Sequence, residues 1–67
     1  MTTQKNHVMK TVISYKNNFY PYLSDVIPNN GDYLFLDYDI DDTHFFLVQM
    51  KTIDIANSQI ILSLVKI

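Results

Sequence analysis

The acidic segment "DYDIDDTH" holds the residues whose types and spacing could do chemistry. Asp37, Asp39 and Asp41 recur at every second position, and Asp42 and His44 follow. Carboxylates at positions 1, 3 and 5 begin an EF-hand calcium loop, but that loop also needs glycine at position 6 and glutamate at position 12. Here these positions hold an aspartate and a valine. A weaker divalent-ion site would use the alternating aspartates and His44, and we predict no dedicated metal site.

The same aspartates could instead form a charged surface for another protein. Alternate residues of a strand lie roughly 6.6 Å apart, so Asp37, Asp39 and Asp41 would present a row of charge that mimics nucleic-acid phosphates. Screening acts over about 10 Å, so such a row would steer a basic partner more than it would fix its affinity. The simplest alternative is that the aspartates solubilise a turn and protect an edge strand from aggregation.

Aromatic residues accompany the acids. Tyrosine is enriched at protein interfaces, and Tyr33 and Phe35 share the predicted strand face of the aspartates. Alternatively, another part of the chain covers them. Base stacking on single-stranded nucleic acid would need a basic groove, and these rings lie beside acids, so the pattern argues against nucleic-acid binding. The predicted partner-binding surface consists of Tyr33, Phe35, Asp37, Asp39, Asp41 and Asp42.

The sequence contains no catalytic motif. It has no cysteine and a single glycine, which leaves no thiol nucleophile and no glycine-rich phosphate loop. Its serines stand in no arrangement with His44 that resembles a catalytic triad. A pocket of about 300 Å³ or more would be hard to form in so small a core. We therefore predict a non-enzymatic protein without a cofactor.

Length and composition favour one small domain over residues 1–67, with residues 1–6 frayed. A chain of 67 residues buries only about 60% of its unfolded surface. Yet 48% of the residues are hydrophobic. Either the core is dense, or another chain covers apolar surface, for which a homodimer is the simplest arrangement.

The charged residues are all aspartate or lysine. Missing arginine removes the best residue for recognising phosphate and guanine. No apolar run approaches the roughly 18 residues that cross a bilayer, and the first ten residues lack the apolar region of a signal peptide. We therefore predict no membrane association and a cytoplasmic location, in the host cell if a phage encodes the protein.

Strands must position these residues. Alternation of apolar and polar side chains predicts four main strands, at 7–16, 32–40, 45–55 and 59–67. The segment 19–28 contains both helix-favouring and helix-breaking features. We predict that it forms an ordered loop with at most one helical turn. Few, strongly twisted strands tend to curl into a small barrel. The residues predicted to face inward are Leu34, Leu36, Tyr38, Ile40, Phe46, Val48, Met50, Ile60, Leu62 and Leu64.

A turn and strand pattern in residues 28–67 resembles the small SH3-like β-barrel proteins of phages and mobile elements. Their pattern is a "P-x-x-G-D" turn, an alternating strand, a tight turn, a long strand and an Asn-containing turn. Pro28, Gly31, Asp32 and Asn57 match it. The resemblance implies a mostly β fold, a small antiparallel sheet curled into an open barrel of four to five strands with minimal helix. It also implies binding rather than catalysis, and it transfers no functional residue.

Two functions follow as expectations. The first is a non-catalytic inhibitor, encoded by a phage or mobile element, that presents the acidic and aromatic surface to a basic host protein in an anti-defence role. Codons for the abundant Lys, Asn, Ile, Phe and Tyr are AT-rich, which suits such an origin. The alternative is a homo-oligomeric structural or ligand-sequestering protein. Its interface would lie on the apolar C-terminal strand, at Ile61, Val65 and Ile67.

Overall fold

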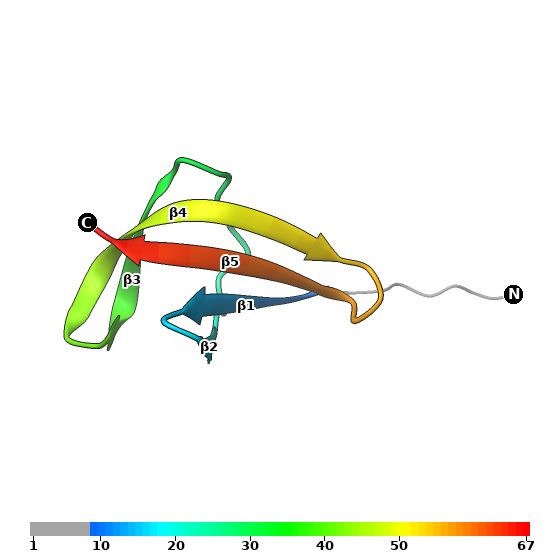
Figure 1. Cartoon of the computed structure of the whole chain (residues 1–67), viewed down its shortest axis with the longest axis horizontal. Coiled ribbons are helices and arrows are strands. Elements are labelled where there is room, and N and C mark those ends of the chain that lie inside the picture. Colours follow the sequence, from blue (N-terminus) through cyan, green and yellow to red (C-terminus); the bar gives the residue numbers. More distant parts are fainter. Residues whose placement is uncertain (1–8) are drawn as a thin grey trace, which may run out of the picture.

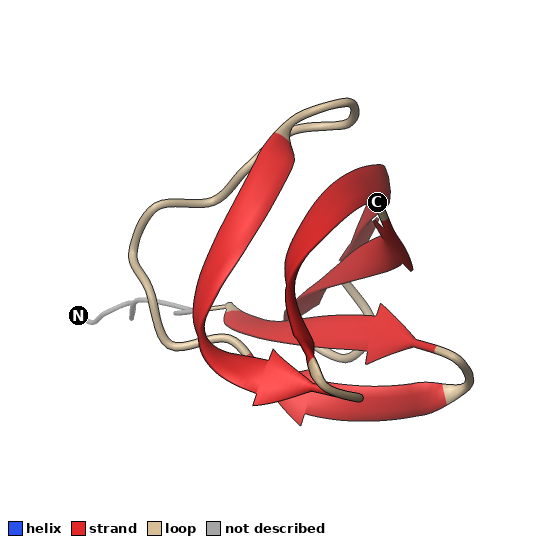
Figure 2. Cartoon of the chain, turned by 90° about the vertical axis from the view of Figure 1, so that its left-hand side faces the viewer, coloured by secondary structure: helices blue, strands red, loops and turns tan. Residues whose placement is uncertain are grey.

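A computed structural model describes residues 9–67, and these residues form one five-stranded sheet without any helix (Figure 1). The sheet curls on itself into an open half-barrel (Figure 2). This confirms the predicted fold class. The predicted frayed residues 1–6, and the start of the first predicted strand, lie outside the described residues. The strands are β1 (Lys10–Tyr15), β2 (Asn18–Pro21), β3 (Tyr33–Ile40), β4 (Thr43–Asp54) and β5 (Gln59–Lys66).

The strand order is β2-β1-β5-β4-β3, so β2 and β3 are the two edges of the sheet. Three of the pairings are antiparallel, as predicted, and each joins two strands that are consecutive in the sequence. The central pairing is different, because β1 and β5 run parallel, with Lys10 opposite Gln59 and Ser14 opposite Ser63. The first and last strands therefore meet in the middle of the sheet.

The core lies on the inner face of the curled sheet. Phe46, Ile13, Leu62 and Val48 are its largest fully buried side chains. The Phe46 ring meets the Tyr15 ring edge-on, with 5.2 Å between the ring centroids. Every residue predicted to face inward is buried in this core or packs against it, with one exception.

The exception is Met50, whose side chain is 54% exposed. The register between β4 and β5 shifts between Val48, which lies opposite Leu64, and Met50, which lies opposite Ser63. One extra residue on β4, Gln49, is thus accommodated as a β-bulge. A bulge reverses the alternation beyond it, so Met50 shares the outer face with Ser63 and the prediction for Met50 is wrong.

The predicted loop 19–28 is wrong in its first part. Asn18–Pro21 forms the short edge strand β2, with Phe19 opposite Ser14. The turn before it has left-handed backbone at Lys16 and Asn17, with φ of 50° and 65°. Pro21 ends the strand at the sheet edge, where a residue without an N–H group is tolerated. The remaining residues, 22–28, form a loop without helix.

The "PNNGD" turn fixes where β3 begins. Gly31 has φ of +87°, a conformation that favours glycine. Its N–H donates to the Val48 carbonyl at 2.8 Å, which ties the turn to β4. The carboxylate of Asp32 accepts the N–H of Asn29 at 2.8 Å. Asp32 is therefore a structural turn residue.

A two-residue turn at Asp41 and Asp42 joins β3 to β4, with Ile40 opposite Thr43. Both turn residues have positive φ, 54° and 61°, which is the pattern of a type I′ turn. Such a turn favours glycine at its second position, because side chains other than glycine are disfavoured in left-handed backbone.

Asp42→Gly is therefore expected to stabilise the protein by about 0.5–1 kcal/mol. Urea denaturation followed by circular dichroism would measure the gain. Asp39→Gly is the matched control, since it removes the same carboxylate from an extended strand and should lower stability instead. Equal effects of the two substitutions would show that charge, rather than backbone conformation, dominates at this hairpin.

Candidate protein-binding surface

Three aromatic side chains form a continuous cluster on the outer face of β3 and β4. Tyr33, Phe35 and Phe45 are 66%, 71% and 42% exposed. The rings of Tyr33 and Phe45 stack with 5.8 Å between centroids, and those of Phe35 and Phe45 meet edge-on at 6.0 Å. We call these three residues the aromatic cluster. Mutual contact of exposed rings makes them a single apolar patch.

Strand pairing produces this cluster. Phe35 lies directly opposite Phe45, and Tyr33 lies opposite Leu47. Because Phe46 points into the core, alternation sends Phe45 and Leu47 outward. The sequence predicted Tyr33 and Phe35 on this face and missed Phe45. The position of Phe45 next to the inward-facing Phe46 was the signal that could have predicted its outward orientation.

His44 extends the cluster toward the hairpin turn. Its ring meets that of Phe35 edge-on, with 4.6 Å between centroids. Its Nδ1 lies 2.9 Å from Oδ1 of Asp39, which makes an ion pair when the imidazole is protonated. Asp39 therefore borders the aromatic cluster and orients the His44 ring. Among residues 9–67, no group of three or more metal-binding side chains comes together.

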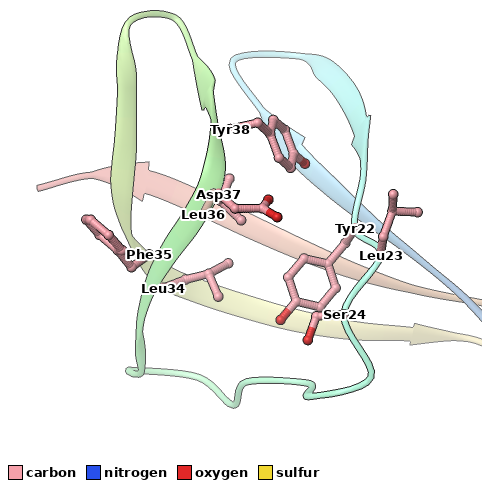
Figure 3. A pocket seen from close by; sticks show the side chains of 8 residues that line it. All are labelled: Tyr22, Leu23, Ser24, Leu34, Phe35, Leu36, Asp37 and Tyr38. Carbon is pink, nitrogen blue, oxygen red and sulfur yellow. The ribbon is translucent and has the colours of Figure 1, made fainter.

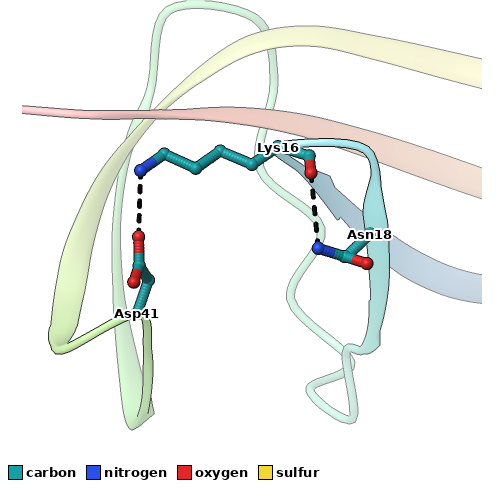
Figure 4. A network of polar contacts seen from close by, with 3 residues as sticks. All are labelled: Lys16, Asn18 and Asp41. Atoms are coloured by element: carbon teal, nitrogen blue, oxygen red, sulfur yellow. Dashed lines mark hydrogen bonds and ion pairs between the residues drawn. The ribbon is translucent and has the colours of Figure 1, made fainter.

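Asp41 departs from the predicted row of acids. It lies in the turn rather than on β3, and its carboxylate pairs with Nζ of Lys16 at 2.9 Å (Figure 4). The hydrogen bond and the charge of Lys16 lower the pKa of Asp41, and Lys66 adds a smaller effect in the same direction. The row is thus reduced to Asp37 and Asp39, both exposed on β3, while Asp42 stands at the turn.

The Lys16–Asp41 pair links the two edges of the open barrel, since Lys16 follows β1 and Asp41 follows β3. Lys16→Met is expected to raise the pKa of Asp41, because its main cationic partner is lost. The present pair stabilises the fold above the unfolded pKa of aspartate, and this contribution is lost as pH falls through the lowered pKa. Lys16→Met should therefore weaken the pH dependence of stability in this acidic range.

An NMR titration of the Asp41 carboxyl carbon would measure this shift. Lys51→Met is the matched control, because Lys51 binds Asn29 on another part of the surface. An unchanged Asp41 pKa in Lys16→Met would show that the pair is absent in solution.

A cleft opens between β3 and the segment that follows β2. Its volume is about 400 Å³. The sequence argument against a pocket concerned the core alone, and this cleft lies instead between the sheet edge and a loop. The residues that line it are Tyr22, Leu23, Ser24, Leu34, Phe35, Leu36, Asp37 and Tyr38 (Figure 3). We call it the β3 cleft.

Two of the residues predicted as an oligomer interface, Ile61 and Val65, lie on the outer face that carries the aromatic cluster, and Ile67 follows the end of β5. Ile61 and Val65 are half-buried on β5, and Ile67 is 58% exposed. Val65 lies opposite Leu47, which in turn lies opposite Tyr33. The two surfaces predicted for different functions are therefore continuous through Leu47.

Comparison with known proteins gives no match: no family model, no curated protein and no solved structure matches the chain. The resemblance to phage and mobile-element barrels stays a prediction, and the barrel-like fold alone is shown. No helix in residues 9–67 is long and apolar enough to cross a membrane. The geometry of the site offers aromatic rings and carboxylates for contact with a partner.

Proposed function

We propose that the protein is a non-catalytic binding protein that docks its aromatic cluster onto a partner protein with a basic surface. The observation that carries the proposal is the mutual contact of Tyr33, Phe35 and Phe45 on an exposed face of paired strands. Large apolar patches on a small soluble protein mark interaction sites. Without a partner to cover them, such exposed rings would only raise the risk of aggregation.

The cluster suits the role of an anchor. Fully burying an aromatic side chain stabilises a complex by roughly 1.5–3 kcal/mol before the costs of association. Strand pairing fixes the backbone at Phe35 and Phe45, and their rings contact each other, so little conformational freedom would be lost on binding. Aromatic anchors surrounded by polar residues are typical of interface hot spots.

Acidic residues surround the anchor on one side. Asp37 and Asp39 are exposed on β3, and Asp42 lies at the turn. These charges would raise the association rate of a basic partner and exclude acidic ones. The charge of Asp41 is compensated by Lys16, so it adds less to this field. Mimicry of nucleic-acid phosphates would therefore depend on only two residues of the predicted row of acids, Asp37 and Asp39.

The setting we propose is that of an inhibitor encoded by a phage or mobile element, acting in an anti-defence role in the host cytoplasm. The AT-rich codons of the abundant residue types and the resemblance of residues 28–67 to small barrel proteins support this origin. The acidic surface supports a basic host target. A protein of 67 residues that acts by occupying such a surface needs no catalytic site.

The test is capture of partners from host lysate with tagged protein at low and high salt. Phe45→Ser should abolish capture of a specific partner, while Phe19→Ser should not, because Phe19 is 67% exposed on the opposite edge strand. Asp39→Lys should reduce capture chiefly at low salt. A partner retained by Phe45→Ser at full yield would contradict the proposal.

A second candidate, a homo-oligomer, is favoured by the continuity of Tyr33, Leu47 and Val65 across β3, β4 and β5. Self-association would cover the aromatic cluster together with the predicted interface residues Ile61, Val65 and Ile67. Light scattering after size-exclusion chromatography separates the two functions. A dimer that persists at high salt and dissociates in Val65→Asp supports the oligomer, whereas a monomer at all concentrations supports partner binding.

A further inference from the structure

The β3 cleft has an apolar floor and a mixed rim. Leu36 and Tyr22 are buried, 7% and 9% exposed, and form part of the core. Leu34 packs against that core from the side (Figure 3). At the rim, Leu23 is 89% exposed and Asp37 is exposed. The volume of about 400 Å³ is at the low end of the range for ligand pockets, which suits a side chain or two of a peptide.

One wall of the cleft is an unpaired strand edge. Within the described chain, β3 pairs with β4 alone, and no backbone hydrogen bond joins it to β2. Two side-chain links bridge the barrel opening instead: the Tyr38 hydroxyl donates to the Pro21 carbonyl, and Lys16 pairs with Asp41. Backbone N–H and C=O groups on the free side of β3 are therefore available to an added strand.

The negative charge of this edge favours a basic peptide segment over a second copy of the chain. Asp37 lines the cleft, Asp39 follows it on the same strand, and no lysine is among the lining residues. A second copy pairing through β3 would bring its own aspartates against these two, and like charges on neighbouring strands are destabilising. An extended segment with apolar and basic side chains would instead match both the floor and the rim.

We propose that the β3 cleft binds an extended peptide segment of a partner protein, which adds as a strand along β3. One apolar side chain of the segment enters the cleft over Leu34 and Tyr22, past Leu23 at the rim, and a basic side chain pairs with Asp37. The segment from Leu34 to Asp37 gives contact over about 10 Å of strand, because the hydrogen bond from Tyr38 to Pro21 closes the opening beyond it. This site is separate from the aromatic cluster, apart from Phe35 at its rim.

The probe is an acetylated, amidated heptapeptide of alternating valine and lysine, followed by NMR of the isotope-labelled protein. Binding should shift the amide signals of residues 22–24 and 34–38, and should slow amide hydrogen exchange on the free side of β3 at least about tenfold. Two N-methylated versions, one on the valine and one on the lysine amides, are the backbone controls. One of the two must lose binding, since alternate N–H groups of a strand point the same way.

Variants test the side-chain contacts. Leu23→Asp should weaken the peptide at least about fivefold without unfolding, because Leu23 is almost fully exposed. Asp37→Lys should abolish binding of the lysine peptide and allow binding of the same peptide with glutamate, whereas Asp42→Lys should change neither. Phe45→Ser should leave the peptide bound, which separates this site from the proposed aromatic anchor.

Several outcomes would overturn the proposal. One is the absence of any shift with the peptide at about 5 mM, which corresponds to a binding free energy weaker than about 3 kcal/mol. Another is equal binding of both N-methylated versions, since strand addition needs backbone donors. Shifts confined to the aromatic cluster, lost in Phe45→Ser, would place the peptide on the outer face instead.

Discussion

Phe46→Ala is expected to leave most of the protein unfolded at 25 °C. Phe46 is fully buried and its ring supports Tyr15 across the barrel. Truncating a buried phenylalanine costs about 3–5 kcal/mol, which includes the cavity left behind. A core of this size supplies a net stability of only about 3–5 kcal/mol. The loss therefore matches the whole stability of the fold.

The adjacent Phe45→Ala is the matched control. Phe45 carries the same side chain on the outer face and is 42% exposed, so its truncation should cost only about 1 kcal/mol or less. Circular dichroism with urea denaturation would compare the two variants. If they lose similar stability, the outer face is covered in solution, and self-association would be the first cause to examine.

Removing two rings of the aromatic cluster is expected to reduce partner affinity at least about 100-fold. Phe35→Ser with Phe45→Ser takes away two anchors, and hot-spot residues cost about 2 kcal/mol or more each when truncated. Both side chains are exposed, so the double variant should remain folded. Surface plasmon resonance with the captured partner would show the loss mainly as faster dissociation.

Charge reversal gives the contrasting result. Asp39→Lys with Asp42→Lys should lower affinity less than about tenfold, chiefly through slower association, and the effect should fade as salt rises. If the acid variant loses more affinity than the aromatic variant, the acids are buried contacts rather than steering charges. The protein would then act as a mimic of nucleic acid after all.

Alternation alone predicted the inner faces of β3 and β5, because each strand has one buried face. This holds for β3 even though its register with β4 shifts between Phe35 and Ile40. The alternation pattern failed at Met50, because the residues "VQM" contain no sequence signal for a bulge at Gln49. It also missed β2, whose four residues carry little alternation and depend on pairing with β1. Local pattern specifies a face, whereas register depends on the partner strand.

The candidate surface was predicted in part for the same reason. Tyr33 and Phe35 follow from alternation within one strand. Phe45 joins them only through the register between β3 and β4. Pairing of Asp41 with Lys16, twenty-five residues apart in sequence, depends on how far the sheet curls. The β3 cleft depends on the same curvature, which no short segment encodes.

The parallel pairing of β1 with β5 has a consequence for synthesis of the protein. Lys10 pairs with Gln59, so this contact cannot form until β5 has been synthesised. Without β5, no strand joins the β1–β2 pair to the β3–β4 pair, and isolated hairpins are marginal in water. Formation of the complete sheet should therefore be slow, in the range of milliseconds to seconds typical of non-local β topologies. A chain stalled before β5 would expose both halves to proteases.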